Sequence, residues 1–212
     1  KKDNFTVFPN VPDLSQSATR PGVARGISRD STLTVVVLYF GVVAERRGVF
    51  DVLEVFEKLA RENHPSRFLV IGPVDKADRQ RFFKTIDSEN LDNIVYYIPW
   101  IDVSELMAYL DISDICIAPF HKNPQHESGV ANKIYDYMLG KKPLIVSNCK
   151  PQKTLVEKYN CGLVYSGKDE MKSAIVKLSA DPGMRKEVGE NGYEAIIRHF
   201  NMNVVKGDLT GL

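Results

Sequence analysis

Apolar and polar positions follow two alternating periods along most of the chain. Residues 33–40 form a nearly unbroken apolar run with many β-branched side chains, which is typical of a strand buried on both faces. From Val49 to Ala60 the apolar residues recur every three or four positions opposite charged ones, which predicts an amphipathic helix. The same alternation continues, and it predicts strands at 67–71, 93–98, 114–119, 143–147 and 163–165 and helices at 75–89, 102–110, 132–139, 151–159, 169–180 and 182–200.

This alternation of strands and helices predicts an α/β fold. Its sheet should be parallel and doubly wound, with helices on both faces. Ligands of such sheets bind beyond the carboxyl ends of the strands, so the strand-to-helix loops are the places to search for chemistry. These loops span residues 41–48, 72–75, 99–103, 119–132 and 148–151.

The predicted domain occupies residues 33–200. Residues 1–32 contain one strand-like run at 5–8 and then a stretch rich in Pro, Gly and Ser, so we expect a segment that enters the domain from an upstream part. Residues 201–212 read as a weakly patterned tail, which we expect to cross back to an N-terminal domain that this chain lacks. Together with the absence of an initiator Met, these ends lead us to expect a piece of a larger, two-domain protein.

Composition narrows the classes of function. Among 212 residues, 28 Lys and Arg balance 27 Asp and Glu, and this near-neutral charge argues against a nucleic-acid binder. No run of 18 apolar residues occurs, so we expect no transmembrane segment. Three cysteines without metal-ligand spacing fit a reducing cytosol and give no reason to expect a metal. We expect Cys116, in an apolar strand, to be buried.

The loop at 41–48 contains the residue types that bind a diphosphate. Gly41 lets the backbone approach a ligand, Arg46 and Arg47 supply charge, and a helix begins at about Val49 with free N–H groups. The loop matches neither the dinucleotide fingerprint nor the P-loop. The alternative is a tight turn carrying two solvated arginines.

The loop at 119–132 and the helix after it hold a second set of polar groups. Glu127, Ser128 and Gly129 precede the helix start, where a phosphate or hydroxyl would find N–H donors. Lys133 and Asp136 lie three positions apart on one helix face, and a carboxylate there can accept both hydrogens of a ribose diol. Alternatively, these two residues form an exposed surface pair worth tenths of a kcal/mol.

Three further side chains leave alternatives open. Trp100 follows a predicted strand and either packs in the core or lines a slot for a nucleobase, whose edge nearby backbone groups would read. His121 and His126 share the long loop without a metal-binding pattern, so we expect them to form hydrogen bonds within it.

Motifs spread over almost the whole chain resemble the C-terminal, nucleotide-sugar-binding half of GT-B glycosyltransferases of family 4, also called group 1. Glu127-Ser-Gly129 followed by Asp136–Pro143 is similar to the family's two-acid motif and its "EAMAxGKPV" run. The other matching segments are Phe5–Pro12, Tyr39–Gly41 with Glu45–Gly48, Phe68–Gly72, Asp114–Pro119 and Cys161–Val164. The resemblance implies a Rossmann-like domain that forms half of a GT-B fold.

The resemblance also implies roles for matching residues. Arg47 stands where the family's Lys holds the donor diphosphate, whereas Val42 stands where the family has an Arg. Asp136 matches the acid that holds the ribose. The family's first acid, beside the sugar, is matched by either Glu127 or Ser128. Glu127 lies one position further from Asp136 than the family pattern has it. Lys133 is similar to a subset of the family with Lys in this helix. The donor-binding set thus expected is Gly41, Arg47, Trp100, Ile101, Ser128, Gly129, Val130, Lys133 and Asp136, with Glu127 as the catalytic candidate.

By the same resemblance the enzyme needs no metal or other cofactor and retains the anomeric configuration. It would transfer a hexose from a UDP- or GDP-sugar to a glycan or lipid-linked acceptor held by its own N-terminal domain, in polysaccharide biosynthesis. We expect a cytoplasmic protein, with peripheral association at the inner face of the membrane as an option for the full-length enzyme. The 212-residue chain alone should bind donor weakly and transfer nothing.

Three other functions stay open on the sequence. A nucleotide-sugar-binding or scaffold domain without catalysis fits the Val at position 42 and the altered acid spacing. Half of a sugar-nucleotide 2-epimerase would share the fold. An unrelated flavodoxin-like regulatory domain would need an acidic cluster at the strand ends, where Gly41 and Gly72 stand instead.

Overall fold

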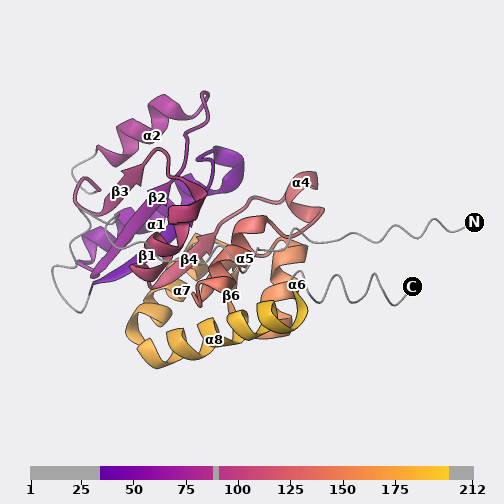
Figure 1. The fold of residues 1–212 in the computed structure, drawn as a ribbon. Coiled ribbons are helices and arrows are strands. Elements are labelled where there is room, and N and C mark those ends of the chain that lie inside the picture. Colours follow the sequence, from indigo (N-terminus) through magenta and orange to yellow (C-terminus); the bar gives the residue numbers. More distant parts are fainter. Residues whose placement is uncertain (1–33, 88–90, 201–212) are drawn as a thin grey trace, which may run out of the picture.

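A six-stranded parallel sheet forms the middle layer of the protein (Figure 1). The computed structural model describes residues 34–87 and 91–200, so the predicted segments 1–32 and 201–212 lie outside the described residues. The strands occur in the order β3-β2-β1-β4-β5-β6. Their bounds are β1 (Val35–Phe40), β2 (Ser66–Ile71), β3 (Val95–Ile98), β4 (Ile115–Ala118), β5 (Leu144–Ser147) and β6 (Gly162–Tyr165).

The strand order changes direction at β1, which places two distant loops side by side. Val37 of β1 pairs with Phe68 of β2 on one side and with Ile115 of β4 on the other. The loops that follow β1 and β4 therefore leave the sheet next to each other. In doubly wound folds this switch point is where ligands bind. The loops at 41–48 and 119–132, which hold most of the candidate site residues, both lie there.

Helices cover both faces of the sheet, as predicted. One face carries α1 (Val49–Arg61), α2 (Arg79–Ile86) and α7 (Lys168–Ala180), and the other carries α3 (Leu106–Asp111), α5 (Asn132–Leu139), α6 (Lys150–Tyr159) and α8 (Pro182–His199). Two apolar clusters fill the layers, because alternate side chains of each buried strand point to opposite faces. Cys116 is fully buried in the second cluster, as expected.

Several predicted elements differ in detail from the observed ones. The helix predicted at 75–89 is shorter, because the carboxylate of Asp75 accepts the N–H of Ala77 and holds a turn before α2. The helix predicted at 102–110 opens with a 3-10 turn, η3 (Val103–Glu105), in which Asp102 and Glu105 form a capping box. α5 ends at Leu139, and the following Gly140 has φ −74°, whereas Lys141 adopts the left-handed φ of 56°.

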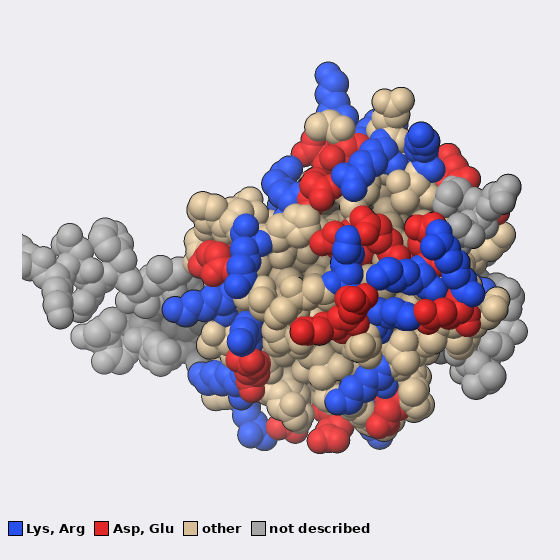
Figure 2. Space-filling view, turned by 180° about the vertical axis from the view of Figure 1, so that it is seen from behind, with Lys and Arg blue, Asp and Glu red and all other residues tan. Residues whose placement is uncertain are grey.

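No helix within residues 34–87 and 91–200 is long and apolar enough to span a membrane. On the face seen in Figure 2, Lys and Arg side chains alternate with Asp and Glu, without a broad patch of one sign. On this face, charge of one sign is confined to small groups of side chains.

Candidate functional site

The loop after β1 is shaped by close approaches that only glycine allows. Gly48 has φ 72° and separates the 3-10 turn η2 (Glu45–Arg47) from α1, and a Cβ there would lie 1.7 Å from the carbonyl oxygen of Pro119. Gly41 has φ 133°, and a Cβ there would meet Nζ of Lys133 at 3.3 Å. The backbone after β1 is thus pressed against both the end of β4 and the lysine of α5.

The two arginines of this loop have different surroundings. Arg46 donates to the carboxylate of Asp75 at 3.0 Å and is half exposed. Its guanidinium lowers the pKa of the Asp75 carboxyl. Arg47 has no such acidic partner among the described residues, and its Nε is buried without a hydrogen bond. The chain therefore leaves the second arginine, the one matched by the family pattern, available for a ligand.

Basic side chains from three segments gather around the ring of Phe120. Lys133 Nζ lies 3.7 Å from the ring centroid of Tyr39 and 4.9 Å from that of Phe120. The guanidinium carbon of Arg47 lies 5.9 Å from the Phe120 centroid, and the His126 ring stacks on Phe120 at 4.4 Å. We call these five residues, Tyr39, Arg47, Phe120, His126 and Lys133, the Phe120 cluster.

The Phe120 cluster contains buried nitrogens that lack hydrogen-bond partners. Four buried side-chain N or O atoms are unpaired within residues 34–87 and 91–200, and three of them are Arg47 Nε, His126 Nε2 and Lys133 Nζ. A buried polar group without a partner costs about 1–3 kcal/mol. Arg47 Nε and Lys133 Nζ are unpaired donors on basic side chains, and two such donors buried together are typical of a site that binds an anion.

Electrostatics in the Phe120 cluster points the same way. Burial, followed by the charge of Arg47, holds the pKa of Lys133 well below that of an ordinary lysine. Lys133 is 7% exposed and makes no ion pair with Asp136, so the alternative of an exposed surface pair is wrong. An anion placed here would satisfy the unpaired donors and offset the repulsion between the two cations.

The start of α5 adds uncapped backbone donors. No side chain caps the helix at Ala131, and a Cβ at Gly129 would meet nothing within 4 Å, so the backbone there is open to a ligand. Asp136 lies one turn further along α5, where burial raises the pKa of its carboxyl to about 6. Residues Ser128 to Val130 thus lead into a helix end whose free N–H groups can donate to acceptor atoms of a ligand.

The two candidates for the first acid both have partners within the protein. The Glu127 carboxylate accepts the N–H of Lys150 at 3.3 and 3.4 Å, at the start of α6. The Ser128 hydroxyl donates to the carbonyl of Gln125 at 2.7 Å. Glu127 ends α4 (Pro124–Glu127), a short helix in a segment that we expected to be loop throughout.

Trp100 lies at the end of β3 with 72% of its surface exposed, so its placement in the core is wrong. The neighbouring Ile101 is 7% exposed and packs in the second apolar cluster, which leaves only its backbone for a ligand. An exposed indole at the carboxyl edge of the sheet remains available to stack on a flat ring.

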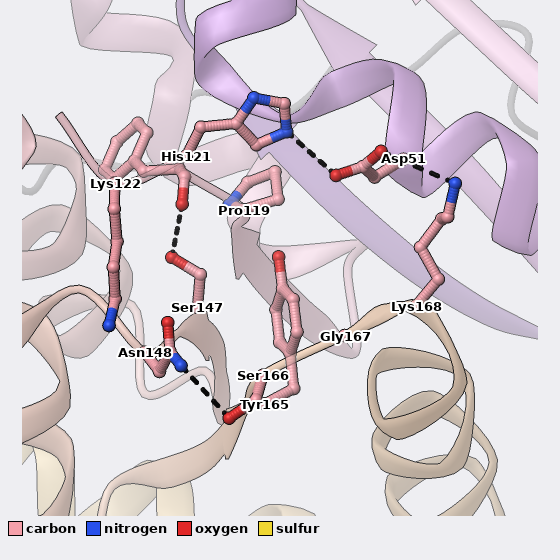
Figure 3. A pocket seen from close by; sticks show the side chains of 11 residues that line it. Asp51, Pro119, His121, Lys122, Ser147, Asn148, Tyr165, Ser166, Gly167 and Lys168 are labelled. Atoms are coloured by element: carbon pink, nitrogen blue, oxygen red, sulfur yellow. Dashed lines mark hydrogen bonds and ion pairs between the residues drawn. The ribbon is translucent and has the colours of Figure 1, made fainter.

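A hollow of about 260 Å³, which Phe120 also lines, lies beyond the ends of β4, β5 and β6 (Figure 3). On its wall, Asp51 is held between His121 Nε2 at 2.8 Å and Lys168 Nζ at 3.9 Å. The hydroxyl end of Tyr165 points into the hollow in Figure 3. His121 therefore forms a hydrogen bond as expected, although its partner lies on α1 and not in its own loop.

The sequence did not single out Tyr39, Phe120 or His126 as site residues. Each lies in an apolar run or a loop where its type is common, and only the pairing of β1 with β4 brings them together. For metals the expectation was none, and the described ranges hold no group of three or more His, Cys, Asp or Glu residues that could bind one.

Comparisons with known proteins fit this arrangement. The model of the family "Glycosyl transferases group 1" matches residues 27–195. Alpha-D-kanosaminyltransferase of Streptomyces kanamyceticus is 22% identical over 84% of this chain and 45% of its own length. Sucrose-phosphate synthase of Thermosynechococcus elongatus has a TM-score of 0.71 at 21% identity, over 84% of this chain and 44% of that one.

A second solved structure is that of a C-terminal domain. The C-terminal domain of a group 1 family protein, LpcC, of Francisella tularensis has a TM-score of 0.68 at 16% identity, over 80% of this chain and 87% of that one. By contrast, the chain spans less than half the length of the curated relatives it matches. The family match excludes an unrelated flavodoxin-like regulatory domain.

Proposed function

The chain belongs to the group 1 glycosyltransferases, and from this premise we propose that residues 34–200 bind the nucleoside diphosphate of an activated sugar. The observation that carries the proposal is the Phe120 cluster, in which three buried nitrogens of basic side chains have no partner. A diphosphate supplies the negative charge and the acceptor oxygens that the donors of Arg47 and Lys133 lack. The cluster also lies at the switch point of the sheet, where doubly wound domains bind nucleotides.

Lys133 accounts for the missing charge at position 42. The family pattern expects an Arg directly after the glycine, where this chain has Val42. Nζ of Lys133 lies 3.3 Å from the position of a Cβ on Gly41, so its charge reaches the same turn of backbone from α5. We propose that Arg47 and Lys133 together hold the diphosphate.

The rest of the nucleotide would extend along the carboxyl edge of the sheet. Asp136, one turn beyond Lys133, would accept the hydroxyls of the ribose. Trp100 would stack on the base, with the backbone of Ile101 beside it. The segment Ser128 to Val130 would bind the transferred sugar through the N–H groups of Gly129 and Val130, since the N–H of Ser128 already donates to Gln125. The donor would be a UDP- or GDP-sugar.

The chemistry that these residues support is stabilisation of the leaving group. When the bond between the sugar and the diphosphate breaks, negative charge grows on the departing phosphate. Cations and helix N-termini fixed in a site from which water is excluded lower the energy of that state. We propose transfer with retention of configuration and without a metal, to a glycan or lipid-linked acceptor held by a further domain.

Calorimetric titration with UDP, GDP and their sugars tests the donor site. Loss of one charge-assisted contact costs about 1.5–3 kcal/mol, so Arg47→Ala should weaken UDP or GDP binding by roughly 10- to 150-fold. Arg46→Ala is the matched control, because Arg46 is already paired with Asp75 and should change affinity much less. Asp136→Ala should weaken nucleotide binding but not pyrophosphate binding. Unchanged binding in both Arg47→Ala and Asp136→Ala would reject the proposed site.

A binding domain without catalysis is the second candidate. It is favoured by one observation, the engagement of Glu127 with Lys150 and of Ser128 with Gln125, which leaves no free first acid. Sugar transfer by the full-length protein, measured with its donor and a glycan acceptor, separates the candidates. Transfer that survives in Glu127→Gln would show that Glu127 is structural while the enzyme is active.

A further inference from the structure

The ring of His126 is held in one orientation. It lies against Phe120, only 7% exposed, and the backbone N–H of His126 donates to the side chain of Asn123. Nδ1 lies 2.8 Å from the carbonyl oxygen of His121, which can only accept, and 2.9 Å from the amide nitrogen of Asn123, which can only donate. Either neutral form leaves one ring nitrogen as a bare lone pair that can take up a proton. Nε2 is the buried ring atom without a partner.

The charges that act on this ring are all positive. Arg46 and Arg47 face it from η2 and Lys133 faces it from α5, while the adjacent residues His121 and Asn123 contribute a carbonyl and an amide. The nearest acid along the chain, Glu127, has its carboxylate on the N–H of Lys150. Burial and these cations lower the pKa of His126. The ring is consequently neutral when the site is empty.

We propose that His126 takes up a proton when an anion binds in the Phe120 cluster, so that donor binding is coupled to proton uptake. This inference rests on the proposed function, because it concerns the same anion site. Burial is the largest cause of the lowered pKa of His126, and the charges of Arg47 and Lys133 add to it. The bound diphosphate offsets these two charges and places negative charge near the ring, which favours the charged imidazolium. The solvent supplies the proton, the imidazole becomes imidazolium, and release of the diphosphate returns the proton.

Proton uptake has a definite sign and size. If the pKa of His126 is higher in the complex than in the free chain, binding tightens as the pH falls between the two values. With one proton taken up, the affinity changes by at most about tenfold per pH unit. The N–H at Nε2 then becomes a third positively charged hydrogen-bond donor beside the departing diphosphate. The nucleotide-sugar site therefore reaches its full positive charge only when a diphosphate is bound.

The experiment is a calorimetric titration of the chain with inorganic pyrophosphate at pH 7, in buffers of different ionisation enthalpy. Pyrophosphate has no ribose, so Asp136 does not contribute. The slope of the observed enthalpy against the buffer enthalpy gives the number of protons taken up. We expect uptake by the parent chain that His126→Asn reduces, because Asn can still donate to the His121 carbonyl but cannot titrate. His121→Asn is the matched control and should retain the parent's uptake.

A second measurement does not depend on a variant that folds. The chain has four histidines, and NMR of a ring-labelled sample follows each of them. Saturating pyrophosphate should move one imidazole toward its charged state at pH 7. Two results would overturn the role of His126 while the anion site stands, provided that pyrophosphate binds. One is proton uptake by His126→Asn equal to that of the parent, and the other is an unchanged charge state of all four imidazoles. If neither pyrophosphate nor UDP nor GDP binds, the proposed function fails together with this inference.

Discussion

Replacement of Lys133 by methionine should stabilise the fold while it removes anion binding. Lys133 is almost fully buried, its Nζ has no hydrogen bond, and its nearest cation is Arg47. Methionine has a similar length and can pack its sulfur against Tyr39 and Phe120. The substitution therefore removes an unsatisfied donor without opening a large cavity.

The expected gain follows from these contacts. An unsatisfied buried donor costs about 1–3 kcal/mol, and the sulfur–aromatic contacts replace the amine's interaction with the two rings. For a domain of this size, 1 kcal/mol shifts the melting temperature by about 2–4 °C, so Lys133→Met should raise it by roughly 2–12 °C at pH 7. Lys84→Met, which changes an exposed lysine on α2, is the matched control and should shift it little.

The gain should also depend on pH in one direction. The pKa of Lys133 is lowered in the folded chain, so between that value and the ordinary pKa of lysine the unfolded chain binds one more proton. Stability of the parent consequently rises with pH in this window, and the advantage of Lys133→Met narrows toward pH 10. Thermal unfolding from pH 6 to 10, with and without UDP, measures both effects. A lower melting temperature for Lys133→Met than for the parent at pH 7 would refute the reasoning.

Three further predictions concern separate parts of the site. Protonation of Asp136 below about pH 6 removes acceptor capacity and should weaken UDP or GDP binding there. In a calorimetric pH series, Asp136→Asn should remove this weakening and leave the tightening expected from His126. Gly48→Ala should cost roughly 2–4 kcal/mol in urea unfolding, since its φ is 72° and its Cβ would strike Pro119, whereas Gly129→Ala should be near neutral. Glu127→Gln should cost about 0.3–1 kcal/mol, because it removes a carboxylate from the start of α6; a much larger loss would contradict its assignment as a cap.

The fold was readable from the sequence because its strands and helices are locally consistent. The apolar run of β1 and the amphipathic pattern of α1 each specify their own structure, and their alternation specifies the parallel sheet. The ends of elements were less certain. α2 and η3 both depend on Asp side chains that accept backbone N–H groups, and such capping contacts vary by a few residues.

The chemistry of the site was only partly readable. Lys133 and Asp136 were chosen for their spacing, but the same spacing occurs in many surface pairs. What separates the two cases is burial against Tyr39 and Phe120, which lie 94 and 13 residues away along the chain from Lys133. His126 gave no signal, because its importance depends on which ring it stacks on and which carbonyl its Nδ1 meets.

The order of strands also governs how the site is assembled as the chain folds. β1, β2 and β3 pair with near neighbours along the sequence, but β4 must find β1 across two intervening βα units. Such long-range pairing forms late, because it requires closure of a long loop. Arg47 belongs to the part of the sheet that forms early, β1 to β3, and Lys133 to the part that forms late, β4 to β6. The repulsion between their charges therefore opposes the step in which β4 pairs with β1. Polyvalent anions in the folding medium should therefore accelerate that step, and a phosphate-poor medium should slow it.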